Sequence, residues 1–385
     1  MKRAIYLLAA TALMASCTQS EVLVDTPNPV PEVPRSIGFD TFVDKATRAT
    51  RANSNALNDF YPAFNVYGWK TVGNETPTPI FNNITVSYYN AEEGKGVKPS
   101  IEWGEAPATG WYYNEIRYWD KMASGYKFSA YAPVQASNDV TCTSDGIITI
   151  GTEKAPITVE TVNLMAKPAE KLAYTGFKYD YMTAQSTANN KDNVSLTFQH
   201  LLAKLNIRIR LDKEKVTTAQ DVSIQKIQVH NLGCYGYYTN DAKAEGTVTG
   251  WKRPNTTDIV DKYIPSVEKA YSLNAAGGNF HNHYVLEQLI IPQTIVPVDD
   301  QKTTIPALSE YKEACIYVEY TIGKEVFKNF TPLANIFGST EATYNFEGGK
   351  QYTLNITVGP APIEFEAEVT SWKEGTEPEP EHKMD

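Results

Sequence analysis

The sequence predicts an all-β protein built from two β-sandwiches in tandem. Three observations support this prediction. Apolar and polar residues alternate in many short runs, each run is bounded by Gly, Pro, Asn or Asp, and strands do not alternate with helical segments. The 24 Tyr residues agree, because Tyr suits half-buried sheet faces. A chain of 385 residues is long enough for two domains that each bury a core.

The composition is that of a globular protein with an acidic surface. Hydrophobic residues make up 42% of the chain and charged residues 21%, which is a globular balance and not a disordered one. The formal net charge is −10, and such a surface repels phosphate backbones. We therefore expect no nucleic-acid partner.

Residues 1–16 have the pattern of an export signal. Lys2 and Arg3 precede an apolar stretch, Ala4–Ser16, that is too short to span a bilayer. The stretch ends in LMASC, and small residues before a Cys resemble the lipobox of bacterial lipoproteins. We expect cleavage before Cys17 and a lipid anchor on this residue, since two or more acyl chains hold a protein stably on a membrane. An ordinary signal peptide with a chance Cys is the alternative.

The tether and the first strand follow the signal. Residues 17–35 are rich in Pro and polar residues, a composition that is extended and semi-rigid. An N-terminal sandwich is predicted over residues 36–188, and its first strand lies within Ser36–Val43. The residues that share one face of this strand are Ile37, Phe39, Thr41 and Val43. A basic link with Arg48-Ala49 and Arg51-Ala52 comes next, which is a suitable substrate for a trypsin-like protease.

Further strands of the N-terminal half are predicted from aromatic and β-branched runs. These runs are FNVYGW (64–69), FNNITVSYY (81–89), YKFSAY (126–131) and GIITI (146–150). A polar stretch, 186–193, predicts the domain boundary, and we place it between residues 188 and 189.

The C-terminal sandwich is predicted over residues 189–375. The clearest alternation runs from Leu201 to Leu211, with odd-numbered apolar residues on the buried face and Lys204, Asn206 and Arg208 on the wetter one. Apolar residues in 222–229 change parity midway, which predicts a bulge. Later strands are predicted over 284–291, 315–322, 352–358 and 363–372. The acidic tail, 376–385, is predicted to be disordered.

Residue patterns typical of catalysis are absent from the sequence. It has no nucleotide-binding glycine loop, no HExxH, no CxxC and no GxSxG. His281 and His283 would share a strand face, but two His residues without a third ligand are a weak metal candidate. His200 precedes a buried strand and is more typical of packing. We therefore expect no enzyme activity, no cofactor and no metal.

Two other groups of side chains have both a functional and a structural interpretation. Glu364, Glu366 and Glu368 lie on one strand face, where a solvated edge that discourages aggregation is favoured over acid-base catalysis. A cluster of aromatic residues suits a sandwich core better than a platform for sugar rings. Its members are Trp111, Tyr112, Tyr113 and Trp119.

Several segments together resemble the fimbrillin family, the pilins of anaerobic oral and gut bacteria. They are the lipobox at Cys17, IGFDTFVDKATRA, FNVYGW, FQHLLAKLNIRI, LIIPQ and VTSWKEG. The resemblance runs from the signal to about Gly375. It implies two transthyretin-like β-sandwich domains, export to the outer membrane as a lipoprotein, and a place in a cell-surface pilus.

The resemblance also implies a mode of assembly. An Arg-specific protease would remove the lipidated N-terminus together with the first strand, here after Arg48 or Arg51. A strand from another pilus subunit would then fill the open groove by β-augmentation. This would give the first strand the role of a temporary occupant.

The last predicted strand has two interpretations. Its apolar face carries Ile363, Phe365, Ala367 and Val369. The strand is either a donor for another subunit or the last native strand of the second sandwich, and the native-strand interpretation favours a tip, accessory or anchor subunit over a shaft subunit. The alternative function is a non-polymerising outer-membrane lipoprotein that binds a glycan or a host ligand.

Overall fold

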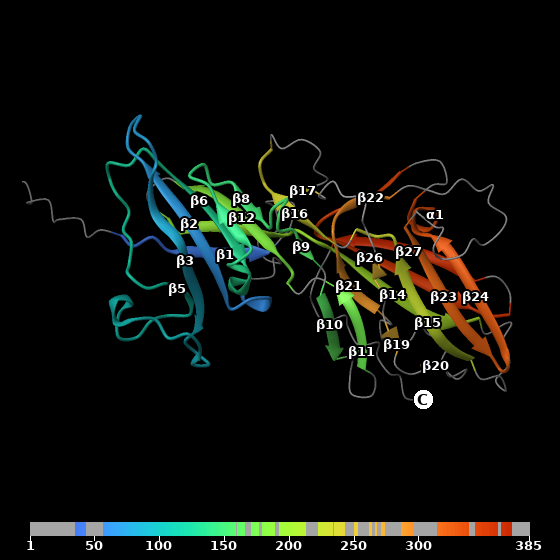
Figure 1. Ribbon diagram of the computed structural model, residues 1–385. Coiled ribbons are helices and arrows are strands. Elements are labelled where there is room, and N and C mark those ends of the chain that lie inside the picture. The colour runs from blue at the N-terminus through green and yellow to red at the C-terminus, as the bar shows by residue number, and fades with distance from the viewer. Residues whose placement is uncertain are drawn as a thin grey trace, which may run out of the picture.

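The computed structural model describes sixteen segments of the chain. They are residues 35–43, 57–158, 160–165, 171–176, 179–188, 192–212, 222–233, 235–242, 250–252, 262–263, 266–267, 271–273, 286–295, 314–338, 343–360 and 363–371. Within them the protein is nearly all-β, and the helical elements are short (Figure 1). They are α1 (Leu333–Phe337), η2 (Leu57–Asp59), η3 (Ile101–Trp103) and η4 (Val134–Ala136). The predicted all-β class is confirmed.

The largest sheet has eight strands and lies mostly in the first half of the chain. Its order is β1-β13-β12-β6-β2-β3-β4, and β5 also pairs with β3. The strands are β1 (Phe39–Val43), β2 (Ala63–Thr71), β3 (Thr78–Asn90), β4 (Lys95–Gly96), β5 (Gly110–Tyr112), β6 (Gly125–Ala132), β12 (Met182–Ala188) and β13 (Val194–His200). β1 is parallel to β13, whereas the other neighbours in this sheet are antiparallel.

The predicted domain boundary falls inside this sheet. β12 and β13 lie on opposite sides of the boundary at 188/189, yet they are antiparallel neighbours, with Met182 opposite His200. The polar composition that indicates a linker also suits a connection between two strands of one sheet. The sheets instead divide after His200, where β13 leads through Leu201 and Leu202 into β14 (Ala203–Leu211). The predicted limits 36–188 and 189–375 therefore do not follow the sheets here.

Two sheets in the second half share one apolar core. The first has the order β21-β14-β26-β27, with β21 (Leu286–Ile290), β26 (Lys350–Val358) and β27 (Glu364–Ser371). The second has the order β18-β15-β23-β24, and β20 also pairs with β15. Its strands are β15 (Val222–His230), β18 (Lys262–Tyr263), β20 (Tyr271–Leu273), β23 (Cys315–Ile322) and β24 (Glu325–Pro332). The register of β15 against β23 shifts between Ile224 and Lys226, which is the predicted bulge.

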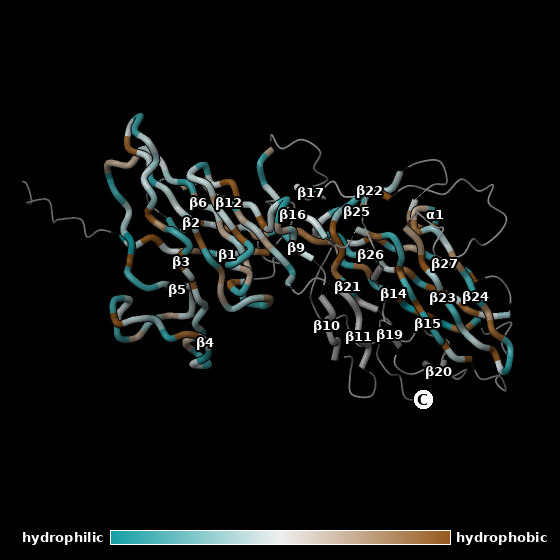
Figure 2. Tube along the Cα trace, viewed as in Figure 1, coloured by the Kyte–Doolittle hydropathy of each residue, from teal (hydrophilic) through white to brown (hydrophobic). Residues whose placement is uncertain are grey.

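Burial along β14 follows the predicted alternation except at Asn206 and at the strand's end, where Leu211 is half-buried. Leu205 and Ile207 are fully buried, whereas Lys204 and Arg208 are half-buried. Asn206 lies on the predicted wetter face but is fully buried. Figure 2 shows the hydrophobic and hydrophilic residues alternating along the strands of both halves. This period of two is expected of strands with one covered face.

A further sheet contains strands from both halves of the chain. Its order is β17-β16-β8-β7, and β9 also pairs with β16. The strands are β7 (Val140–Cys142), β8 (Ile148–Ile150), β9 (Ile157–Thr158), β16 (Tyr235–Thr239) and β17 (Trp251–Lys252). An apolar cluster beside it includes Tyr67 and Trp69 from the N-terminal sheet and Leu201 and Trp251 from the second half. The two halves are therefore joined by shared structure.

The remaining strands form two small sheets. One contains β10 (Glu160–Met165), β11 (Lys171–Gly176) and β19 (Ser266–Val267), and the other contains β22 (Gln293–Ile295) and β25 (Tyr344–Phe346). Within the described segments, no helix has the length and apolar character needed to cross a membrane.

Candidate functional site: the first strand and its groove

The first strand lies in the core of the N-terminal half with one face inward. Ile37, Phe39, Thr41 and Val43 are exposed by only 0, 3, 6 and 4%. Asp40, between them, is exposed to solvent. The four residues that the sequence places on one face therefore all point into the same groove.

Phe39 occupies an aromatic pocket at the centre of this groove. Its ring centroid lies 5.5 to 6.0 Å from those of four other rings, all in edge-to-face geometry. These rings belong to Phe64, Phe81, Tyr113 and Phe128. Edge-to-face pairs stabilise packing beyond the burial of apolar area, because the positive ring edge meets the negative ring face. The pocket is therefore shaped for a large aromatic side chain.

One edge of the segment is hydrogen-bonded to β13. The two strands are parallel and in register from Phe39 opposite Val194 to Val43 opposite Phe198. The ladder extends one residue earlier, where the Val194 N–H donates to the Gly38 carbonyl at 2.8 Å. Removal of β1 would leave these backbone groups of β13 without partners, which is costly inside a protein.

The other edge is held at its N-terminal end by a loop, residues 113–119. The Ile37 N–H donates to the Arg117 carbonyl at 2.8 Å, and the Tyr113 hydroxyl donates to the Ile37 carbonyl at 2.7 Å. The Trp119 N–H donates to the Arg35 carbonyl at 3.0 Å. The first segment therefore lies in a slot with a hydrogen-bonding wall on each side.

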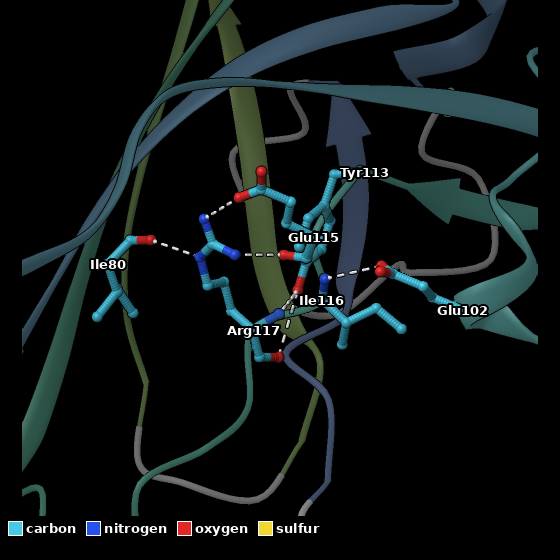
Figure 3. A network of polar contacts seen from close by, with 6 residues as sticks. All are labelled: Ile80, Glu102, Tyr113, Glu115, Ile116 and Arg117. Carbon is cyan, nitrogen blue, oxygen red and sulfur yellow. Dashed lines mark hydrogen bonds and ion pairs between the residues drawn. The ribbon is translucent and has the colours of Figure 1, made fainter.

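Polar contacts fix the shape of this loop wall (Figure 3). The Arg117 guanidinium donates to the Glu115 carbonyl at 2.6 Å, to the Glu115 carboxylate at 3.0 Å and to the Ile80 carbonyl at 3.3 Å. Glu115 has a φ of 59°, in the left-handed region that non-Gly residues rarely adopt. The ion pair is solvent-accessible, so we assign it a positioning role and little net stability.

Burial keeps the Tyr113 phenol neutral. Desolvation raises its pKa well above the ordinary value, although the hydrogen bond and charge of Arg117 act in the opposite direction. A neutral phenol is a hydrogen-bond donor, which matches its contact with the Ile37 carbonyl.

Two positions of the first strand, Thr41 and Gly38, have unusual surroundings in the groove. The Thr41 hydroxyl is buried and has no hydrogen-bond partner among the described residues. At Gly38, an added Cβ would lie 2.3 Å from the Asn193 Oδ1 atom. The Asn193 amide itself donates to the Asp40 carboxylate at 3.1 Å.

The last predicted strand is β27, the edge strand beside β26. Ile363 is buried and Phe365 is half-buried, but Ala367 is exposed and Val369 is 45% exposed. The strand thus occupies a native position in its own sheet while half of its apolar face remains open. Glu366 is exposed, as are its two neighbouring glutamates, and lies 3.7 Å from Arg210.

The aromatic cluster of the N-terminal half is mostly structural. Tyr113 and Trp119 are buried, and Trp111 and Tyr112 are half-buried. Trp111 packs against Phe64 with centroids 5.1 Å apart, which ties it to the same core.

Several predicted functional residues lie outside the described residues. They are Cys17, Arg48, Arg51, His281 and His283. Within the described segments, no group of three or more His, Cys, Asp or Glu residues is arranged to hold a metal ion. His200 is buried, and its Nδ1 lies 2.7 Å from the Asp180 carboxylate.

The loop wall was not predicted from the sequence. Tyr113 and Arg117 act on a strand more than 70 residues earlier in the chain, as the separation of 76 between Tyr113 and Ile37 shows. In the sequence, only the run of aromatic residues around them indicates that this region is buried.

Comparisons with known proteins point to one family. A family model described as fimbrillin-like matches residues 47–372. The chain is also 22% identical over 217 residues to the fimbrium subunit Fim1C of Phocaeicola vulgatus, which covers 54% of this chain and 52% of that protein. This match therefore spans about half the length of the curated relative.

Solved structures give more distant likenesses. A fimbrial protein from Bacteroides vulgatus is 14% identical with a TM-score of 0.45, covering 88% of this chain and 100% of that one. The tip fimbrial protein Mfa3 from Porphyromonas gingivalis, with a C-terminal truncation, is 11% identical with a TM-score of 0.37. That alignment covers 81% of this chain and 94% of that one.

Proposed function

The chain belongs to the fimbrillin-like family, and on this premise we propose that it is a structural or accessory subunit of a cell-surface pilus, assembled by strand exchange and contributing to adhesion. The precursor is anchored in the outer membrane through lipid on Cys17. An Arg-specific protease cuts after Arg48 or Arg51 and thereby frees the first strand to leave. The partners are other pilus subunits.

The groove around β1 supports this proposal. Departure of β1 would expose the aromatic pocket around Phe64, Phe81 and Phe128 together with an unpaired edge of β13. An extended strand from another subunit can satisfy both the apolar surface and the backbone groups. Such a contact joins different surfaces of two copies and does not close on itself, so repetition gives a fibre.

One observation carries the proposal: two strands of this chain have the same apolar face. The first strand reads IGFDTFV from Ile37, and the last reads IEFEAEV from Ile363. Ile, Phe and Val recur at the first, third and seventh positions, and the fifth position is Thr41 in one and Ala367 in the other. We assign 363–369 of a second copy as the donor that takes the place of 37–43.

The outward face of the donor keeps one carboxylate but differs at two positions, where Glu364 takes the place of Gly38 and Glu368 that of the half-buried Phe42. Glu366 corresponds to Asp40, so it supplies a carboxylate where the Asn193 amide donates. Glu364 corresponds to Gly38, where a Cβ would meet the end of the Asn193 side chain. Asn193 is exposed and can rotate away from Glu364, but this rotation gives up the hydrogen bond to the neighbouring carboxylate. The two interpretations of the last strand then describe successive states, native in the free subunit and donated in the fibre.

Limited digestion tests the exchange. The full chain carrying Cys17→Ala is treated with trypsin and followed by intact mass and size-exclusion chromatography. We expect a resistant fragment that begins at Ala49 or Ala52 and slowly forms higher oligomers. The control is the triple change Lys45→Ala, Arg48→Ala, Arg51→Ala, which removes every trypsin site between Val43 and Ala52 and should stay monomeric. A cut fragment that stays monomeric at high concentration contradicts strand exchange and favours a non-polymerising surface lipoprotein.

A further inference from the structure

We infer that Thr41 is the position that makes the first strand replaceable and that selects an apolar residue at the same position of the incoming strand. This inference rests on the proposed function, because it concerns the occupant of the same groove. It is carried by the surroundings of one side chain. Thr41 lies at the centre of β1 (Phe39–Val43) and is 6% exposed.

The three residues that the strand geometry places beside Thr41 on the buried face are apolar. Its parallel cross-strand neighbour is Leu196, which is fully buried. Phe39 and Val43, two residues before and after it, point into the same core and are exposed by 3 and 4%. These neighbouring side chains are all apolar, and the Thr41 hydroxyl has no hydrogen-bond partner among the described residues.

The hydroxyl is an isolated defect in an otherwise well-packed strand. Within residues 35–43, Thr41 Oγ1 is the only buried side-chain polar atom without a hydrogen-bond partner. A buried hydroxyl without a partner destabilises the folded state, because its hydrogen bonds to water are lost and not replaced. A methyl group of the same shape has no such bonds to lose.

The defect has different effects before and after cleavage. In the uncut chain, β1 is covalently linked to its sheet, and the high effective concentration of a tethered strand offsets a local loss of affinity. Cleavage removes the tether, so the defect then favours departure of β1. An incoming strand without a hydroxyl at this position binds the same groove more tightly.

The strand that fits this requirement is 363–369 of a second copy. It repeats the apolar residues at Ile37, Phe39 and Val43 and places Ala367 where β1 has Thr41. The exchange therefore keeps the packing of the three large side chains and removes the unpartnered hydroxyl. The difference between Thr and Ala gives the reaction a direction.

The change Thr41→Val tests the inference, with Thr197→Val as the matched control. Thr197 lies on the adjacent strand β13 but is exposed, so the same substitution there alters no buried hydroxyl. In the uncut chain we expect Thr41→Val to slow hydrogen exchange of the Phe39–Val43 amides by about 5- to 100-fold. Unchanged or faster exchange in Thr41→Val overturns the inference.

Peptide uptake after trypsin cleavage provides the second measurement. A synthetic peptide of residues 361–371 should displace the cut N-terminal fragment more slowly from Thr41→Val than from the unmodified chain or Thr197→Val. The same peptide with Ala367→Thr should bind more weakly by about 5- to 100-fold. Equal binding of the two peptides contradicts the selection of an apolar residue.

The two measurements separate the two proposals. If neither peptide enters the groove of any cut protein, strand exchange by this donor fails, while hydrogen exchange still decides whether Thr41 weakens β1. If peptides enter equally well regardless of the residue at this position, strand exchange stands and the role of Thr41 is wrong.

Discussion

At the scale of single residues, a few side chains determine how firmly the first strand is held. Phe39 fills the aromatic pocket, and Tyr113 contributes both a ring to that pocket and a hydroxyl to the Ile37 carbonyl. Arg117 offers its own carbonyl to Ile37 and is itself oriented by Glu115. The hydrogen bonds among these contacts come from β1 and from a single loop, so substitutions that remove them should act locally.

Tyr113→Phe should weaken the hold on the first strand while leaving its ring in place. The change removes the donor of the 2.7 Å hydrogen bond and leaves a buried carbonyl unpaired. We expect a loss of about 1–3 kcal/mol in the free energy that protects β1. Hydrogen exchange of the Ile37–Val43 amides measures it. Tyr112→Phe, at a half-buried position, is the control, and equal effects of the two changes would contradict the assigned contact.

The same tyrosine should make the free energy of unfolding depend on pH in alkaline solution. Burial raises the pKa of Tyr113 in the folded state above its unfolded value of about 10. The stability tied to the neutral phenol is therefore complete below about pH 10 and is lost as pH rises through the folded pKa. Urea titrations above pH 10 should show a shallower decline for Tyr113→Phe. An unchanged slope would mean that this phenol does not stay neutral in the folded state.

At the scale of elements, β14 offers the clearest test of the second core. Ile207→Ala should reduce the free energy of unfolding by about 2–5 kcal/mol, because Ile207 is fully buried and its loss leaves a cavity. Arg208→Ala, on the half-buried opposite face, should cost much less. Urea denaturation compares the two variants. Equal losses would show that the faces of this strand are assigned wrongly.

Local patterns in the sequence were sufficient to predict several of the longer strands and the buried face of the first one. The inward set from Ile37 to Val43 and the bulge near Ile224 follow from alternation alone, because burial of one face has a period of two. The pairing partners did not follow, since β1 pairs with β13 beyond the predicted end of the first domain, with Phe39 opposite Val194. Alternation also failed at β27, where Val369 is exposed because no described strand covers that edge of the sandwich.

At the scale of the whole molecule, each half has its own apolar core, and the two halves are joined by a sheet to which both contribute strands. The sheet β17-β16-β8-β7 takes β7 and β8 from the first half and β16 and β17 from the second. The polar stretch around residue 188 predicts a division there, but the pairing of β12 with β13 crosses it, and a long-range pairing leaves no local pattern in the sequence. Because both halves contribute to this sheet, a substitution that destabilises one half should also lower the free energy of unfolding of the other.

The lipid anchor proposed on Cys17 would attach the whole molecule to the membrane. Cys17→Ala should abolish labelling by radioactive palmitate and leave the signal uncleaved by the lipoprotein peptidase, because the acyl acceptor is lost. Palmitate incorporation and the intact mass of the protein isolated from these cells measure lipidation and cleavage, with Cys142→Ala as the control. Palmitate that still enters the Cys17→Ala protein would show that lipid is attached elsewhere.

The parallel pairing of β1 with β13 has a mechanical consequence for a fibre under tension. β13 leads directly into β14, so a pull on the acceptor's C-terminal half reaches β13 at its C-terminal end. In the proposed fibre, a donor in the place of β1 would be attached to its own subunit at its N-terminal end, before Ile363. Parallel strands pulled from opposite ends slide along one another, so the hydrogen bonds of the ladder bear the load together and do not open one by one. In an antiparallel insertion, the load would fall on one hydrogen bond of the ladder after another. The direction of this five-residue strand would therefore determine whether the contact between two subunits resists shear in flowing liquid or opens one hydrogen bond at a time.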